Sequence, residues 1–263
     1  MGNPAGLDVT RPNVARVYDY LLGGKDNFAS DRAVGDQIIA SLPATQVGVR
    51  AQRDVLARVV RYLAGDAGLT QFLDIGSGLP TADNVHQIAK RINPGARVVY
   101  VDNDPVVLSH ANALLADHKQ TFAVNADLRD PGGVIAAATR HLDWDRPVGL
   151  LLCGIVHYIL DEEHPGDITA ALIDALPSGS YVFIHHLLHT GDPASADLEA
   201  AMRRGLGRVQ FRTHEQILDL FAGLSLVEPG LVLVPDWRPD PQTLTTQDNS
   251  VLGLASVGVG YRP

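Results

Sequence analysis

The spacing of apolar residues along the chain changes near residue 66. Before that point, apolar residues recur three and four positions apart, as at Val14, Val17 and Leu21, which is the spacing of one face of a helix. The glycine pair at residues 23–24 is typical of a helix end, and a second helix is expected from Ser30. We therefore predict a helical cap over residues 1–65 and a second unit over residues 66–263.

Beyond residue 71, short apolar runs alternate with segments of helical spacing. The runs predict five strands, at residues 72–75, 97–101, 121–124, 148–152 and 181–184. The helices expected between and after them cover residues 83–91, 106–116, 133–140 and 167–176. Parallel strands need crossover helices of this kind and are covered on both faces. The pattern predicts the α/β class, with a doubly wound, mostly parallel sheet.

The C-terminal part follows a different pattern. Two helices are predicted at residues 193–204 and 213–221. The apolar runs at residues 224–227, 231–234 and 251–259 are then joined by turns and loops rather than by a long helix. Strands connected in this way pair antiparallel, so we expect an antiparallel edge on the sheet.

Composition and charge narrow the possible functions. Apolar residues make up 46% of the chain and no unit repeats, as in an ordinary globular protein. The net charge of −9 repels phosphate backbones and anionic lipids, so we expect neither a nucleic-acid nor a membrane partner. The arginines at 50, 53, 58 and 61 are expected on the solvated face of a helix. Cys153 is the single cysteine, and no apolar run is long enough to span a bilayer, so a cytoplasmic location is expected.

A glycine-rich turn follows the first predicted strand. Residues 72–81 read Phe-Leu-Asp-Ile-Gly-Ser-Gly-Leu-Pro-Thr, so that Asp74 precedes Gly76 and Gly78. Glycines let the backbone turn sharply and approach a ligand without a β-carbon. A dinucleotide site needs a third small residue where Thr81 stands, and no Lys or Arg lies between Gly76 and His86 to assist a pyrophosphate. The turn therefore favours a ligand with positive charge beside Asp74.

Acids also close the next two predicted strands. Asp102 follows the second strand, where such folds bind a ribose diol, and Asp127 follows the third, where a carboxylate can accept from an adenine amino group. Acids also end strands simply as turn formers. That explanation is favoured for Asp104 and Asp130 and stays open for Asp127 taken alone. The occurrence of Asp102 together with the glycine turn favours a nucleotide-type site.

These motifs resemble the cofactor motifs of class I S-adenosylmethionine (SAM)-dependent methyltransferases, over residues 71 to about 190. Residues 11–28, Arg-Pro-Asn-Val-Ala-Arg-Val-Tyr-Asp-Tyr-Leu-Leu-Gly-Gly-Lys-Asp-Asn-Phe, followed by Asp31-Arg32, resemble the N-terminal signature of an actinobacterial S-adenosyl methyltransferase family first described as a domain of unknown function. The resemblance implies a Rossmann-like, seven-stranded sheet with an antiparallel last strand, SAM as cofactor and S-adenosylhomocysteine (SAH) as product. The cofactor-binding residues that it implies are Asp74, Gly76, Ser77, Gly78, Asp102, Asn103, Asp127, Leu128 and Cys153.

Three histidines are candidates for chemistry on the methyl acceptor. His157 follows the fourth predicted strand, and His185 and His186 end the fifth, at the edge where sheets of this class bind ligands. A histidine there can take a proton from the acceptor, with His157 the preferred base, but hydrogen bonding within the strand ends explains each histidine equally well. The run Cys153 to Tyr158 replaces the Asn-Pro-Pro-Tyr motif of many relatives of the class, which disfavours methylation of a planar amino group.

The N-terminal motif supplies a further hypothesis. Tyr18, Lys25, Asn27, Phe28 and Arg32 either close over the cleft as a lid, with Lys25 or Arg32 pairing with the SAM carboxylate, or pack the cap onto the sheet. We predict a methyltransferase that acts on oxygen or nitrogen of a small molecule, without a metal. The alternatives are a non-catalytic SAM-binding regulatory protein and, less favoured, an NAD(P)-dependent oxidoreductase.

Overall fold

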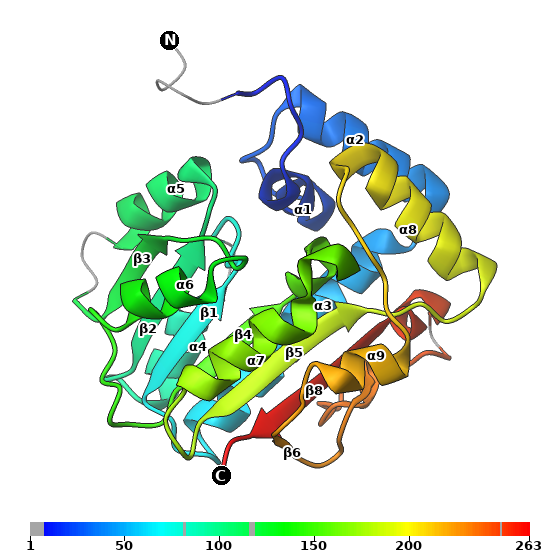
Figure 1. The fold of residues 1–263 in the computed structure, drawn as a ribbon. Helices are drawn as coiled ribbons and strands as arrows, with labels where there is room; N and C mark the ends of the chain where they lie inside the picture. Colours follow the sequence, from blue (N-terminus) through cyan, green and yellow to red (C-terminus); the bar gives the residue numbers. More distant parts are fainter. Residues whose placement is uncertain (1–7, 81–82, 116–118, 248) are drawn as a thin grey trace.

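In the computed structural model, a mostly parallel β-sheet forms the centre of the protein (Figure 1). The structure describes residues 8–80, 83–115, 119–247 and 249–263, and within these ranges the sheet has eight strands. They are β1 (Gln71–Ile75), β2 (Arg97–Asp102), β3 (Thr121–Asn125), β4 (Gly149–Cys153), β5 (Tyr181–Leu187), β6 (Ser225–Leu226), β7 (Val232–Leu233) and β8 (Ala255–Tyr261). Their order across the sheet is β3-β2-β1-β4-β5-β8-β6, and β7 pairs with β8 beside this path.

The strand directions confirm the predicted topology. β1 to β5 pair in parallel, and β8 runs antiparallel to β5. β7 adds a two-residue strand to the seven-stranded path that the resemblance implies. The strand predicted over residues 251–259 is wrong at its start, because the Asn249 side chain accepts from the Val251 N–H and begins a 3-10 helix, η4 (Ser250–Gly253). Thr81 and residue 116, the predicted end of a helix, lie outside the described residues.

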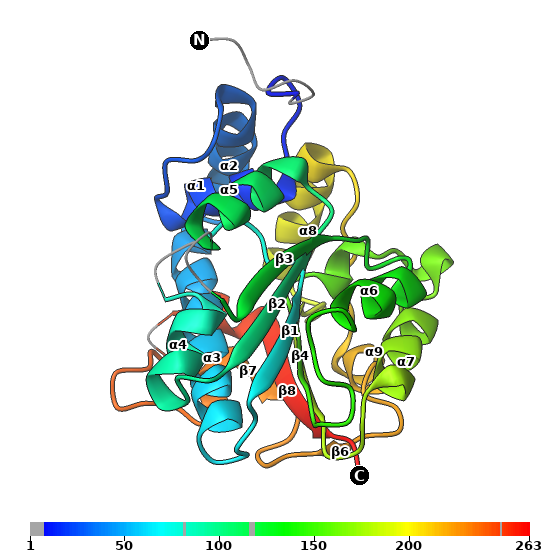
Figure 2. The same cartoon turned by 90° about the vertical axis from the view of Figure 1, so that its left-hand side faces the viewer.

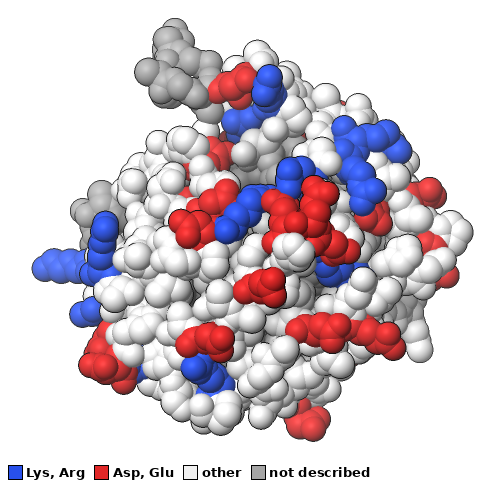
Figure 3. All heavy atoms as spheres, viewed as in Figure 1, with Lys and Arg blue, Asp and Glu red and all other residues white. Residues whose placement is uncertain are grey.

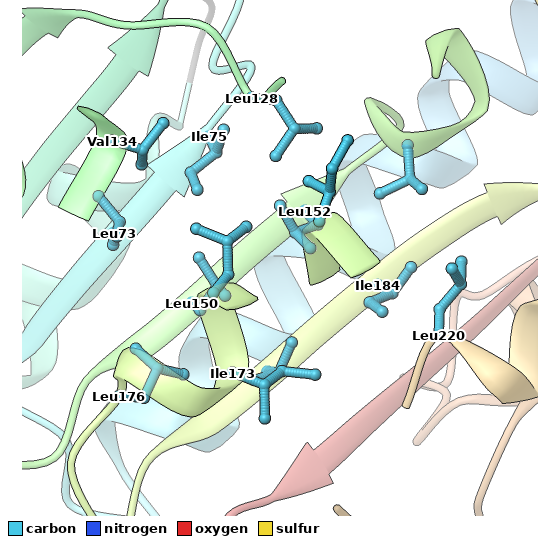
Figure 4. Close-up of a cluster of buried hydrophobic side chains, with 14 of the residues drawn as sticks. Leu73, Ile75, Leu128, Val134, Leu150, Leu152, Ile173, Leu176, Ile184 and Leu220 are labelled. Atoms are coloured by element: carbon cyan, nitrogen blue, oxygen red, sulfur yellow. The ribbon is translucent and has the colours of Figure 1, made fainter. Parts of the chain in front are cut away.

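Helices cover both faces of the sheet (Figure 2). α3 (Thr45–Ala64), α4 (Val85–Ile92) and α5 (Pro105–Leu115) lie over one face, and α6 (Pro131–Ala138), α7 (Pro165–Ala175) and α9 (His214–Asp219) over the other. Successive strand residues point to opposite faces, so Phe72 packs in the core with α3 whereas Leu73 packs in the core with α6 and α7. Figure 4 shows this second core, in which Leu73 and Leu150 lie near Val134 and Ile173.

A cap of helices covers the carboxyl ends of the strands (Figure 1). It consists of α1 (Val14–Leu22), α2 (Ala29–Ser41) and α8 (Pro193–Leu206), whose buried side chains form a third core that includes Val17, Ile38 and Leu198. The cap therefore includes α8, a helix far outside the N-terminal region. Conversely, α3 belongs to the N-terminal region but buries Val59 and Leu63 in the core of the sheet. The boundary after residue 65 stays a prediction.

The N-terminal motif holds the starts of α1 and α2 together. Asp31, fully buried, accepts hydrogen bonds from the backbone N–H groups of Asn13 (2.9 Å) and Phe28 (2.8 Å), and from the Arg16 side chain (2.9 Å). Removing one partner of a buried ion pair leaves an uncompensated charge, which destabilises a protein by about 3–5 kcal/mol. Asp31 and Arg16 of the motif thus fix the geometry of the cap.

Candidate active site

A cavity of about 350 Å³ lies between the carboxyl ends of the parallel strands and the cap. This volume is near the lower end of the ~300–1,000 Å³ of small-molecule sites. The structure brings every residue implied for cofactor binding to its lining: Asp74, Gly76, Ser77, Gly78, Asp102, Asn103, Asp127, Leu128 and Cys153. They meet because parallel strands that point the same way end at one edge of the sheet.

Asp74 lies near the end of β1. Only 5% of its surface is exposed, and this burial raises the pKa of its carboxyl to about 7, with the Arg53 cation opposing the rise and the Asp102 carboxylate adding to it. Gly76 then turns the chain at φ +71°, and a β-carbon there would lie 2.5 Å from the Ile155 side chain. The backbone can follow this path only with glycine at position 76.

Asp102 joins the ends of β2 and β1. Its Oδ2 accepts from the Gly78 N–H at 2.9 Å and its Oδ1 from the Asp104 N–H at 3.0 Å. Burial raises the pKa of Asp102, although these hydrogen bonds oppose the rise. The Gly78 N–H is therefore occupied by a carboxylate instead of facing a phosphate, and α4 begins only at Val85. Each Asp102 oxygen keeps a lone pair for a hydroxyl donor such as a ribose diol.

Asp127 and Asn103 meet at the end of β3. The Asn103 Nδ2 donates to Asp127 at 2.9 Å, and so does the backbone N–H of Arg129 at 2.9 Å. Burial acts to raise the pKa of Asp127, but these hydrogen bonds and the Arg129 charge outweigh it and lower the pKa. The carboxylate is thus ionised and can accept a further hydrogen bond, beside the buried side chain of Leu128.

Gln52 and Arg53 of α3 also line the cavity. Gln52 Nε2 lies 3.7 Å from the Cys153 sulfur, and burial raises the pKa of that thiol to about 12, so Cys153 stays a neutral lining group. Arg53 lines the cavity close enough to lower the pKa of Asp74, and it donates to the carbonyl of Asp83 at 3.3 Å. The expectation that the arginines of this helix lie on a solvated face was wrong for Arg53, which lines the cavity, and for Arg58, which is buried and donates to the Trp237 and Val234 carbonyls at 3.0 and 2.8 Å. The available signal was that Gln52 and Arg53 interrupt a stripe of small and apolar residues at helical spacing.

His157 and His185 both line the cavity. They are 3% and 2% exposed, and the Nδ1 atom of each has no hydrogen-bond partner among the described residues. Burial lowers the pKa of His185 to about 4. Burial and the neighbouring His186, His185 and Arg212 lower the pKa of His157 well below its usual value. Both rings are therefore neutral at neutral pH.

His186 lies outside the cavity lining and is held by a separate network. Its Nε2 faces the Arg212 guanidinium at 2.9 Å, so Nε2 must accept and Nδ1 must donate to the Leu187 carbonyl at 2.7 Å. Burial, with the Arg212 charge adding to it, lowers the pKa of His186 to about 3. Arg212 also bonds the Ile159 carbonyl at 2.8 Å and Asp161 at 2.7 Å. These contacts occupy both ring nitrogens of His186, so the residue has a structural role outside the cavity lining.

Of the five residues assigned to a lid, Tyr18 alone lines the cavity, where its hydroxyl donates to the Val49 carbonyl at 3.3 Å. Asn27 donates to Asp19 at 2.9 Å, and Arg32 donates to Asn27 at 3.1 and 3.2 Å. Phe28 lies 5.4 Å from the Arg16 guanidinium, and Lys25 is exposed. These four residues lie in the turn between α1 and α2 and at the start of α2. A closing motion of the segment stays a hypothesis.

On the face seen in Figure 3, Lys and Arg are interspersed with Asp and Glu. Among the residues that the structure describes, no three His, Cys, Asp or Glu side chains gather in a way that could hold a metal ion. Within the same ranges, no helix is both long enough and apolar enough to cross a membrane.

The fold and the strand-end cavity define a SAM-dependent methyltransferase of the doubly wound α/β class. The chain belongs to the S-adenosyl methyltransferase family, whose model matches residues 2–261. No protein with a curated description matches the sequence.

Solved structures agree with this assignment. The chain is similar to a candidate methyltransferase from Thermobifida fusca, with 44% identity, a TM-score of 0.92 and 98% of each chain covered. It is also similar to a DUF574 family protein from Streptomyces avermitilis, with 38% identity, a TM-score of 0.92, and 97% of this chain and 99% of that one covered. The N-methyltransferase NodS from Bradyrhizobium japonicum, solved with SAH, shares the fold at 13% identity and a TM-score of 0.51, over 94% of this chain and 99% of its own.

Proposed function

We propose that the protein transfers the methyl group of SAM to an oxygen or nitrogen atom of a small-molecule acceptor held in the cavity. The observation that carries this proposal is the continuity of one lining, which includes the strand-end acids Asp74, Asp102 and Asp127 and also the buried, neutral His157 and His185. A cofactor half and an acceptor half therefore share one cavity.

The residues of the cofactor half fit the chemical groups of SAM. Asp74 and Arg53 offer one negative and one positive charge side by side, which suits a zwitterionic amino acid with its ammonium and carboxylate. Asp102 keeps free lone pairs for the ribose hydroxyls, and Asp127 with Asn103 lies where an adenine amino group can donate. When bound, SAM supplies an electrophilic methyl carbon, whose bond to sulfur breaks as a bond to the acceptor oxygen or nitrogen forms, leaving SAH and a proton.

We propose that His157 accepts the proton that the acceptor loses. Because the pKa of His157 is lowered well below its usual value, the ring stays unprotonated and can accept a hydrogen bond from the acceptor throughout the neutral range. A base of low pKa is also a weak one. It suits a phenol, whose proton leaves readily, or an amine, which attacks through its lone pair and releases a proton only after methylation, better than an aliphatic alcohol. His185, on the same wall, supplies a second polar contact.

The test combines binding and turnover. Isothermal titration with SAM, SAH and NAD should give binding of SAM and SAH, lost or strongly weakened in Asp102→Ala. Asp145→Ala removes an exposed acid that does not line the cavity and serves as the matched control. Release of SAH on incubation with a panel of phenols and amines would then establish turnover. Binding of NAD in preference to SAM, or SAM binding without SAH release from any acceptor class, would contradict the proposal.

A further inference from the structure

The lining of the cavity divides into a charged half and an apolar half. The charged side chains include Arg53 of α3, Asp74 and Asp102 in the last residues of β1 and β2, and Asp127 in the loop after β3. Arg129 and Arg208 also contribute, and both are bonded to the Glu163 carboxylate, at 2.6 and 2.5 Å. By contrast, α1, α2, α8 and η4 contribute no charged side chain to the lining.

The apolar half is built from the cap. Its walls include Val17, Leu21, Ile38, Leu198, Met202 and Val251. These residues come from four segments that are distant in the sequence, and α8 lies beside α2 in Figure 1. A charged group placed among such side chains loses its hydration without gaining a partner, which is strongly unfavourable. The apolar half therefore selects against charge on its ligand.

The polar side chains at the border between the halves include the half-buried Tyr18 and the buried His157 and His185. The Tyr18 hydroxyl is engaged with the Val49 carbonyl. His157 and His185 each keep an Nδ1 atom without a partner, in residues that are more than nine-tenths buried. Buried polar groups normally have hydrogen-bond partners, so unpartnered rings on a cavity wall point to a ligand that completes them. The rings of Tyr18, Tyr158 and His157 also give this border an aromatic wall.

We propose that the apolar half is the acceptor subsite and that it takes an uncharged ring compound with one phenolic hydroxyl, directed at His157. This inference rests on the proposed function and names the substrate class of the same site. The apolar rings fill the space between α1, α2 and α8, and the hydroxyl faces the unpartnered Nδ1 of His157. The low pKa of His157 agrees with this class, because a phenol loses its proton far more readily than an alcohol.

Binding of matched probes to the SAH-loaded protein tests the inference. We expect 2-naphthol to bind at least about tenfold more tightly than 6-hydroxynaphthalene-2-sulfonate, because the sulfonate would bury a charge. 2-Methylnaphthalene, which lacks the hydroxyl, should also bind more weakly than 2-naphthol. Equal or tighter binding of the sulfonate, or no binding of 2-naphthol to protein that binds SAH, would overturn the acceptor class while leaving the cofactor assignment intact. Failure of the wild-type protein to bind SAH would instead overturn the proposed function.

Substitution of Met202 tests where the acceptor subsite lies. Met202→Lys places a cation in the apolar half and should reverse the preference toward the sulfonate, whereas Ala200→Lys, at an exposed position of the same helix, should leave it unchanged. SAH affinity serves as the check on folding for both variants. An unchanged preference in Met202→Lys protein that still binds SAH would overturn the location. If Met202→Lys does not fold, Met202→Gln replaces it, with a smaller shift in the same direction expected.

Discussion

Asp102 accepts a hydrogen bond from the backbone N–H of Gly78 at 2.9 Å, so that the acid at the end of one strand holds the glycine turn that follows its neighbour. The side chain therefore has two tasks in the proposed site. It shapes the turn, and it presents the rest of its lone pairs to the cavity.

The two tasks can be separated by substitution. Asp102→Asn keeps an oxygen for the Gly78 N–H but loses the charge, whereas Asp102→Ala loses both. We expect SAM affinity to fall by about tenfold in Asp102→Asn and by a further order of magnitude or so in Asp102→Ala, in keeping with ~1.5–3 kcal/mol for a hydrogen bond to a charged group. Isothermal titration measures both affinities. Equal affinities for the two variants would show that the turn contact does not contribute.

The meeting of Asp74, Asp102 and Asp127 could be predicted from the sequence, because each acid follows an apolar run and parallel strands end at a common edge. The five parallel strands were predictable for the same reason, since buried runs alternate with helical spacing. Arg53 was missed because a charge on an amphipathic helix is usually solvated, and the polar interruption of the apolar stripe does not by itself reveal that α3 crosses the strand ends. The part that α8 plays in the cap was equally hidden, since it depends on contacts between segments more than 150 residues apart, such as the bond from Ser41 to the Asp197 carbonyl.

SAM affinity should depend on pH through Asp74. The buried carboxyl has a pKa of about 7 in the free protein, and an ammonium placed beside it favours the ionised form. Binding therefore releases a proton below pH 7, and we expect the affinity to rise by more than about tenfold between pH 5 and pH 7. Titrations across this range in wild type and Asp74→Asn provide the measurement. A pH dependence that persists in Asp74→Asn would assign the effect to another group.

The same carboxyl should make the free protein less stable at higher pH. Its folded-state pKa lies above the unfolded value of 3.8, so between about pH 4 and pH 7 the folded state binds more protons and stability falls as pH rises. The penalty reaches as much as about 4 kcal/mol above pH 7. Asp74→Asn should therefore raise the free energy of unfolding at pH 8 and change it little at pH 4. Urea unfolding at the two pH values measures this difference, and equal effects of the substitution at both would contradict the assignment.

Arg53 and Lys25 are alternative partners for the SAM carboxylate, and substitution distinguishes between them. Arg53 lines the cavity next to Asp74, whereas Lys25 is exposed in the turn after α1 and does not line it. We expect Arg53→Ala to weaken SAM binding by about tenfold or more, because a charge-assisted hydrogen bond is lost. Lys25→Ala should change the affinity by less than about twofold, in line with an exposed charge. The reverse order of effects would favour the hypothesis that the N-terminal segment closes over the cofactor as a lid.

The role of His157 can be tested on the turnover of 2-naphthol. Loss of a positioned base typically lowers a rate by about 10²–10⁴-fold, so we expect His157→Ala to lower kcat within that range while SAH affinity is retained. Because the pKa of His157 is lowered well below its usual value, wild-type turnover should show no titration of this ring between pH 6 and pH 8. His189→Ala provides the matched control, since His189 is exposed near the end of β5 and does not line the cavity. Turnover in His157→Ala that equals wild type at every pH would remove His157 from the mechanism and leave the acceptor proton to water.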